Sequence, residues 1–473
     1  MSWYGKSGAG SPDLCNALDA RAMLPALLLL GATLAAGGDS GYLVGIAEVK
    51  ITPPLGTPMA GFSARQGPSK GVHDDLFVKS LVVTRAEAGL ALVTCEVIGV
   101  ERTLVEEVRR LAAQQTGLRP EHILVAATHT HSGPVVRGEY ERFLIASAVE
   151  SIVQAWRSRR PRSIGTGTAT HRGWVGMNRR RLEAGFSPVD KEIQLLTVTG
   201  SRGRVEAVLF NYPCHPACLG PDNLLITADW PFFVSEQVKE RLGRDVPVLF
   251  FQGTQGNINT GYSAGLSAIG VPIPTRTFAY AQELGETIAT AILARLPDIP
   301  RQADGPLGGL KETVALERYV PSTLDEAKAK LEQAQRQLEQ AEKTGAPLPH
   351  LHAARVNRAF AQSSLERLQR NLEAGQRQYA AELQAFRIGE AGLVSFPGEF
   401  FVEVGLEVKK RSPFRTTFCL GLANDTIGYI PTEEAYPEGG YEVSVTRFGP
   451  QSAARWQDAA ARLLGVLASA GAR

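Results

Sequence analysis

The stretch Ile123-Leu-Val-Ala-Ala-Thr-His-Thr-His-Ser-Gly-Pro134 joins an apolar run to two histidines. The run Ile123–Ala127 is typical of a buried strand. The Ser-Gly-Pro that follows predicts a loop, so His129 and His131 lie where the strand ends. In open α/β sheets, ligand clefts form at the carboxyl ends of strands. The two histidines are therefore candidate site residues.

Strands and helices alternate on both sides of this stretch. Strands are predicted at 42–51, 76–85, 89–97, 193–199, 205–211, 246–251, 392–396 and 417–423. Helices are predicted at 103–117, 143–157, 233–242, 277–296, 400–411 and 457–468. This alternation predicts an α/β fold, a layered mixed β-sheet flanked by helices.

Residues 322–383 break the alternation, because they are rich in Ala, Glu, Gln, Lys, Arg and Leu at helical spacing. Ser322 is the predicted N-cap. Thr344-Gly-Ala-Pro-Leu-Pro349 interrupts the pattern, which predicts an inserted helical hairpin. Its two histidines, His350 and His352, are interpreted as solvated residues near the tip.

The N-terminal residues 1–38 resemble a leader rather than part of a fold. An apolar stretch at 24–36, preceded by Arg21 and followed by small residues, is typical of a secretory signal. This predicts export, to the periplasm or outside the cell. A short membrane anchor is the alternative. Cys214 and Cys218 would form a disulfide or stay as buried thiols, the second being the preferred interpretation.

The composition excludes some partners. Of 473 residues, 44% are hydrophobic and 21% charged, and the formal net charge is +2. This is ordinary for a globular protein with a substantial core, and the charge gives no reason to expect a nucleic acid partner. We expect residues 39–473 to form one domain that contains the hairpin.

Three further side chains that can bind a metal lie after predicted strands: His215, Glu399 and Tyr429. Catalytic zinc is often held by two histidines and a glutamate, with one position left for water, and such a water is a usable nucleophile. Each residue has an ordinary alternative. His215 would be a packed loop residue, Glu399 would be favoured at a helix start by the macrodipole, and Tyr429 would belong to the core.

Four motifs in order resemble the neutral, alkaline non-lysosomal ceramidases. They are ATHTHSGP at 127–134, NYPCHP at 211–216, PGEFF at 397–401, and GLANDTIGYIPTEEAYPEGGYEVSVTRFGP at 421–450. The resemblance extends from Val44 to Pro450. It implies a zinc-dependent hydrolase of linear N-acyl amide bonds, in which zinc-bound water attacks the carbonyl.

The resemblance also implies roles for individual residues. Zinc ligands would be His129, His215, Glu399 and Tyr429. His131 would protonate the leaving amine, while Arg179 and Tyr441 would donate to the oxyanion. The implied partner is a small N-acyl substrate, with a lipid as one candidate, which leaves room for a peripheral membrane contact; the oligomeric state stays undetermined.

The sequence departs from the family pattern in four places. Asn259 replaces a serine implicated in catalysis, and an amide cannot be an acyl nucleophile; it could still orient a substrate. His73-Asp-Asp-Leu76 replaces an Arg-rich segment, and Asp74 or Asp75 would either select a substrate group or cap a strand. We expect no counterpart of the family's C-terminal β-sandwich, and the hairpin precedes Glu399. These departures leave the zinc site intact but put ceramide itself in doubt.

Asp229 is a further candidate catalytic residue, with a helix N-cap as the structural alternative. Two other functions remain open. The same site would serve an esterase, lactonase or small-amide hydrolase. Alternatively, the chain would be a binding protein on a degenerate scaffold, but the complete set of two histidines, a glutamate and a tyrosine argues against this.

Overall fold

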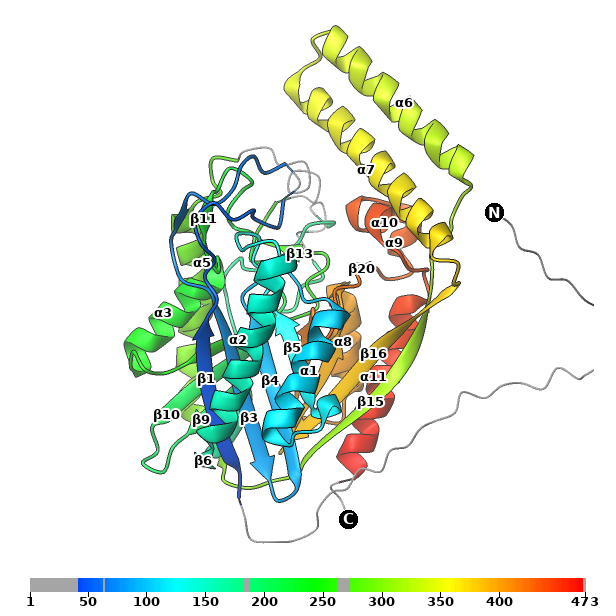
Figure 1. The fold of residues 1–473 in the computed structure, drawn as a ribbon. Coiled ribbons are helices and arrows are strands. Elements are labelled where there is room, and N and C mark those ends of the chain that lie inside the picture. Colours follow the sequence, from blue (N-terminus) through cyan, green and yellow to red (C-terminus); the bar gives the residue numbers. More distant parts are fainter. Residues whose placement is uncertain (1–40, 63, 182–184, 186, 263–272, 471–473) are drawn as a thin grey trace, which may run out of the picture. The chain divides into compact units, whose positions relative to one another are not determined.

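The computed structural model describes residues 41–62, 64–181, 185, 187–262 and 273–470 (Figure 1). The predicted leader and Cys15 lie outside these residues. In the described part of the chain, no helix combines the length and apolar character needed to cross a membrane.

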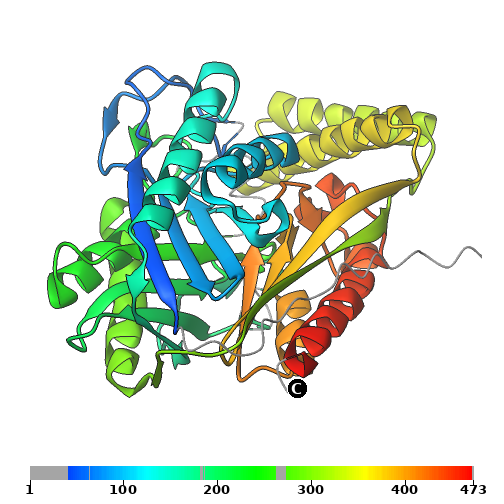
Figure 2. The ribbon, with the colours of Figure 1, turned by 60° about the horizontal axis from the view of Figure 1, so that its bottom comes forward.

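Three sheets carry most of the strands (Figures 1 and 2). The first has the order β5-β4-β3-β1-β6, formed by β1 (Leu43–Lys50), β3 (Phe77–Arg85), β4 (Ala88–Cys95), β5 (Ile123–Ala127) and β6 (Arg160–Pro161). The second has the order β12-β10-β9-β7-β14, formed by β7 (Ser163–Thr170), β9 (Glu192–Thr199), β10 (Val205–Tyr212), β12 (Val248–Gln252) and β14 (Arg301–Gln302). The third has the order β15-β16-β17-β19, formed by β15 (Leu307–Glu317), β16 (Gln378–Ile388), β17 (Ala391–Phe396) and β19 (Thr416–Gly421).

Short strand pairs and helical turns complete the loops. The pairs are β2 (Gly71–Val72) with β11 (Leu225–Ile226), β8 (Met177–Asn178) with β13 (Ile258–Asn259), and β18 (Glu399–Phe400) with β20 (Tyr429–Ile430). The turns are η1 (Pro120–His122), η2 (Leu296–Asp298), α9 (Ala435–Glu438) and α10 (Tyr441–Val445).

Each large sheet has a pair of helices on its outer face. They are α1 (Arg102–Thr116) and α2 (Gly138–Arg157) on the first, α3 (Trp230–Leu242) and α5 (Phe278–Arg295) on the second, and α8 (Val402–Arg411) and α11 (Ser452–Ser469) on the third. The inner faces of all three sheets share a fourth core, which includes Leu124, Leu249 and Leu420. Strand β5 therefore alternates, with Val125 packed under its helices and Leu124 in the shared core. This layered α/β architecture confirms the predicted fold class.

Each large sheet also contains one parallel strand pair: β4 with β5, β10 with β12, and β17 with β19. The edge strands β5, β12 and β19 contact one another. Backbone hydrogen bonds join β5 to the segment that follows β19, as from Asn424 N–H to the carbonyl of Val125 at 2.7 Å. The carboxyl ends of these parallel pairs therefore meet, and the loops that follow them carry the candidate site.

The helical hairpin is confirmed but two of its predicted limits are wrong. Its helices are α6 (Leu324–Lys343) and α7 (Leu348–Glu373). Thr323, not Ser322, is the N-cap, because its hydroxyl and Glu326 form a capping box. The second helix ends at Glu373 rather than near Leu383, because Gly375 turns the chain (φ 63°) into β16, which pairs with β15.

Of the described strands longer than two residues, three escaped prediction: β7, β15 and β16. Strand β7 reads SIGTGTAT and has few large apolar residues, while β15 is partly solvated and carries Gly, Lys and Glu. Cys214 and Cys218 are free and buried, as preferred, and so are Cys95 and Cys419.

Candidate metal and active site

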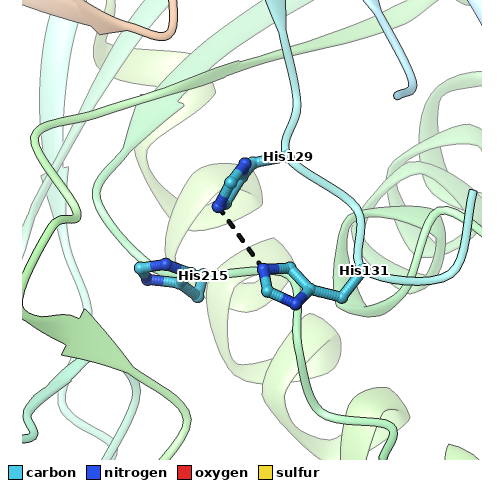
Figure 3. A group of neighbouring side chains, drawn as sticks. All are labelled: His129, His131 and His215. Carbon is cyan, nitrogen blue, oxygen red and sulfur yellow. Dashed lines mark hydrogen bonds between the residues drawn. The ribbon is translucent and has the colours of Figure 1, made fainter. Parts of the chain in front are cut away.

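The loop after β5 bends sharply at His129, which has a φ of 74°. A non-glycine residue rarely adopts this conformation. The bend is held by hydrogen bonds from His129 N–H to Val97 O at 2.9 Å and from His131 N–H to Pro216 O at 3.1 Å. It brings the rings of His129 and His131 next to that of His215 (Figure 3).

Backbone carbonyls select the tautomer of two of these histidines. Nδ1 of His129 lies 2.6 Å from the carbonyl oxygen of Ile98, and Nδ1 of His215 lies 2.7 Å from that of Ile258. Because a carbonyl oxygen only accepts, each Nδ1 carries the proton. The lone pair of each Nε2 therefore points away from the backbone, as in metal-ligating histidines.

Both Nε2 atoms converge on the carboxylate of Glu399. Its Oε2 lies 3.0 Å from Nε2 of His215 and 3.3 Å from Nε2 of His129. Burial raises the pKa of this carboxyl, but the two histidines outweigh that effect and bring the pKa well below its usual range. Burial lowers the pKa of His215 to about 4. The three atoms form a nitrogen, nitrogen and oxygen donor set that fits a divalent transition metal.

His131 belongs to the same cluster but is held differently. The ligand atoms of His129, His131 and His215 all lie within 4.8 Å of one another. Nε2 of His131 is 3.4 Å from Nε2 of His129, the contact drawn dashed in Figure 3. Its Nδ1 is buried and has no hydrogen-bond partner among the described residues. Burial, followed by the charges of His129 and His215, holds the pKa of His131 well below its usual value.

Tyr429 enters the site from β20, which pairs in parallel with β18 and places Tyr429 opposite Glu399. Its hydroxyl accepts a hydrogen bond from Nη2 of Arg179 at 3.1 Å. Burial and then the charge of Glu399 raise the pKa of this phenol well above its usual value. Gly256 packs closely against the backbone of Glu399. A side chain at this position would collide with the carbonyl oxygen of Glu399.

One charged residue that the sequence analysis missed, Glu442, anchors Arg179. Glu442 is fully buried and accepts from Nε of Arg179 at 2.7 Å and from Nη1 of Arg180 at 2.9 Å. Burial opposes the charge of Arg179, but Tyr429 and Glu442 raise its pKa overall. Glu442 directly follows Tyr441 in the last motif, and that adjacency was the available signal.

Tyr441 begins α10 and lies beside Tyr429, with ring centroids 5.6 Å apart. Its other neighbour is Phe360 of α7, also at 5.6 Å. Burial and the charge of Glu399 raise the pKa of Tyr441 to about 12. The predicted residues His129, His131, His215, Glu399, Tyr429, Arg179 and Tyr441 are thus brought into one region.

The side chains of the two remaining predicted residues, Asp229 and Asn259, accept hydrogen bonds from nearby backbone N–H groups. Asp229 accepts from the N–H groups of Cys218, Leu219 and Trp230, which supports the N-cap alternative. Oδ1 of Asn259 accepts from the N–H groups of Gly261 and Tyr262.

The aspartates of the His73 segment also have structural partners. Asp74 accepts from Ala228 N–H at 2.8 Å, and Asp75 pairs with Lys50 at 2.8 Å. Both contacts support a structural role for these aspartates, such as capping a strand, rather than a role in selecting substrate.

Comparison with known proteins confirms the resemblance seen in the motifs. No family model matches the chain. The neutral ceramidase of Pseudomonas aeruginosa is 23% identical over 92% of this chain and 74% of its own length. The crystal structure of neutral ceramidase from that organism has a TM-score of 0.69 at 20% identity, covering 91% of this chain and 75% of the other. A structure of ceramidase complexed with C2 has a TM-score of 0.70 at 20% identity, covering 91% and 76%. These structures share the fold of this chain.

Proposed function

We propose that this protein is a zinc-dependent hydrolase of N-acyl amide bonds. The observation that carries the proposal is the convergence of His129 Nε2, His215 Nε2 and Glu399 Oε2, with both histidines oriented by backbone carbonyls. Such an arrangement has no evident use in packing, since it brings two unprotonated nitrogens together in a buried place. The similarity to a neutral ceramidase supports the amide bond as the one cleaved.

Tyr429 is proposed as the fourth zinc ligand. It is paired opposite Glu399, and Arg179 donates to its hydroxyl, which leaves an oxygen lone pair for a cation. Two imidazoles, a carboxylate and a phenol suit zinc better than magnesium or calcium, which prefer oxygen alone. His131 is proposed to stay outside this set, because no carbonyl among the described residues orients its Nδ1.

Zinc bound here would activate water and polarise the scissile carbonyl. His131 is neutral at rest, because burial lowers its pKa. It is therefore able to take a proton from the attacking water and return it to the leaving amine nitrogen. Tyr441 and Arg179, beside Tyr429, are proposed to donate hydrogen bonds to the oxyanion.

Export through residues 1–38 and a single hydrolase domain from residue 39 are part of the same proposal. The apolar stretch with its flanking small residues supports the leader.

The test combines metal analysis with a substrate panel. Protein purified without added metal should contain zinc and should release free acid from N-acyl amides. His129→Ala should lose both zinc and activity, whereas His350→Ala, an exposed histidine of α7, should retain both. A zinc-free wild-type protein, or a His129→Ala variant with unchanged turnover, would refute the proposal. Faster cleavage of matched esters would favour the esterase alternative.

A further inference from the structure

Arg276 is a buried cation with an unused donor. It precedes α5, is 7% exposed, and donates from Nη2 to the carbonyl of Ala217 at 2.7 Å and from Nε to that of Cys218 at 3.4 Å. Its Nη1 is buried without a hydrogen-bond partner in the described part of the chain. A buried donor left unpaired is unfavourable, and more so when the group is charged. Such a group calls for a partner that the described residues do not provide.

Two aromatic rings surround the guanidinium of Arg276. Its Cζ lies 5.0 Å from the ring centre of Phe62 and 4.9 Å from that of Tyr262. Arg65 lies over Phe62 as well, at 5.1 Å. In Arg65, unlike Arg276, every side-chain nitrogen donates a hydrogen bond. The acceptors are the carbonyls of Ala60, His131 and Asn223.

The charge of this pair is not balanced by a nearby ion pair. Burial, and then the charge of Arg276, lower the pKa of Arg65 to about 10. Burial also lowers the pKa of Arg276. Asp229, and more weakly Asp222, oppose that effect. The oxygens of Asp229 are bound to three backbone N–H groups, and Asp222 forms no ion pair with either arginine among the described residues. Among the described residues, no carboxylate pairs with either arginine. An anion bound here would balance the positive charge of both arginines.

This cation lies on the His131 side of the site. The carbonyls that hold Arg276 belong to the loop that follows His215, and the ring of Phe62 packs against that of His131 at 4.9 Å. On the Tyr429 side, in contrast, the charge of Arg179 is matched by Glu442. Since His131 is the proposed proton donor to the leaving amine, Arg276 would lie near the amine portion of a bound substrate.

Asn259 shapes the loop that lies beside Arg276. Its amide accepts from Gly261 and Tyr262 N–H and donates to the carbonyl of Tyr262. This turn holds Tyr262 against Arg276. The residue that stands in place of the family's serine thus contributes to the environment of the unpaired guanidinium.

We propose that Arg276 binds a carboxylate on the amine portion of the substrate, which makes N-acyl amino acids the preferred substrates. The inference rests on the proposed amide hydrolase function. Water adds to the acyl carbon, the C–N bond breaks, and the products are a carboxylic acid and an amino acid. The carboxylate accepts a charge-assisted hydrogen bond from Nη1, the type that buried arginine forms most strongly.

The test compares N-lauroylglycine with N-lauroylethanolamine, which has the same acyl chain but no carboxylate. Wild-type protein should show a higher kcat/KM on the glycine conjugate. Arg276→Gln should lower the ratio between the two substrates by roughly tenfold to a hundredfold, mainly through KM, as expected for a lost hydrogen bond to a charged group. Arg244→Gln, an exposed arginine paired with Glu236, should leave the ratio unchanged.

The outcomes separate this inference from the proposed function. If the wild type cleaves neither substrate, the amide hydrolase function fails. If it prefers the ethanolamide, or if Arg276→Gln lowers both activities equally, the carboxylate site is overturned and the hydrolase function stands. Product inhibition of the wild type gives a readout that requires no variant: glycine should inhibit more strongly than ethanolamine, and equal inhibition would contradict the inference.

Discussion

At the scale of single residues, backbone carbonyls set the chemistry of the site. Ile98 and Ile258 each accept the Nδ1 proton of one histidine, which orients both Nε2 lone pairs toward Glu399. The φ of 74° at His129 costs of order 1–3 kcal/mol. This strained conformation brings the His129 ring into the histidine cluster. Backbone strain of this kind is commonly found at functional sites.

Glu442 is a positioning residue for Arg179. Its replacement in Glu442→Gln would leave two buried arginines without their shared carboxylate, and breaking a buried pair typically costs about 3–5 kcal/mol. We expect a lower free energy of unfolding and a kcat reduced at least about tenfold, because a freed guanidinium no longer fixes Tyr429 and the oxyanion region. Zinc content should stay near that of the wild type. The checks are denaturant unfolding, kcat and metal analysis.

Glu438→Gln is the matched control, since Glu438 also pairs with Arg180 but is partly exposed. Exposed pairs contribute about 0–1 kcal/mol, so stability and kcat should hardly change. Equal effects of the two substitutions would contradict a special role of Glu442.

At the scale of elements, the helical hairpin supports the segment that bears Tyr441. Figure 1 shows α7 next to α10 and the far end of the hairpin extending away from the sheets. Three contacts join α7 to α10: Phe360 with the ring of Tyr441, Ser364 Oγ with the carbonyl of Ser444 at 3.2 Å, and Arg367 Nη1 with that of Val443 at 3.0 Å. The hairpin's own core is small, so its base rather than its tip is the part tied to the site.

Phe360→Ala should therefore impair catalysis more than folding. Loss of the ring leaves Tyr441 without its α7 neighbour, and a misplaced oxyanion donor lowers kcat. We expect a reduction of about tenfold in kcat, with an unchanged zinc content. Arg358→Ala, on the exposed part of the same helix, is the control. Wild-type kcat in the Phe360 variant would show that the hairpin does not position Tyr441.

At the scale of the whole molecule, the proposed metal ligands come from different sheets. His129 follows β5 of the first sheet, His215 follows β10 of the second, and Glu399 follows β17 of the third. A metal bound by all three residues would link the three sheets. The ligands come together only in the folded protein, so the metal would bind the native state and not the unfolded chain. Binding to the native state only stabilises a protein by mass action.

Removal of metal should therefore lower the thermal unfolding temperature. The stabilisation lost is about 4 kcal/mol if free zinc had been a thousandfold above its Kd. Calorimetry before and after dialysis against a chelator, and again after zinc is restored, measures the effect. The His129→Ala variant should show no such shift, and a shift as large as in the wild type would place the stabilising ion elsewhere.

Much of the molecule could be predicted from the sequence. Strands such as Ile123–Ala127 can be predicted from their apolar runs, because a strand buried on both faces needs apolar side chains throughout. Prediction failed where local composition and tertiary pairing disagree. Residues 378–383 have helix-forming composition but form the first part of β16, since β15 supplies a partner strand along their whole length.

The sequence by itself determined the α/β class and the types of side chain at the strand ends, including His129, His215, Glu399 and Tyr429. Only the tertiary structure decided which atoms meet, because the contacts join three sheets that are distant along the chain. It also decided that Glu442 matches the charge of Arg179, while Nη1 of Arg276 has no partner among the described residues. Whether a buried charge is balanced depends on neighbours across the fold, and no local pattern records them.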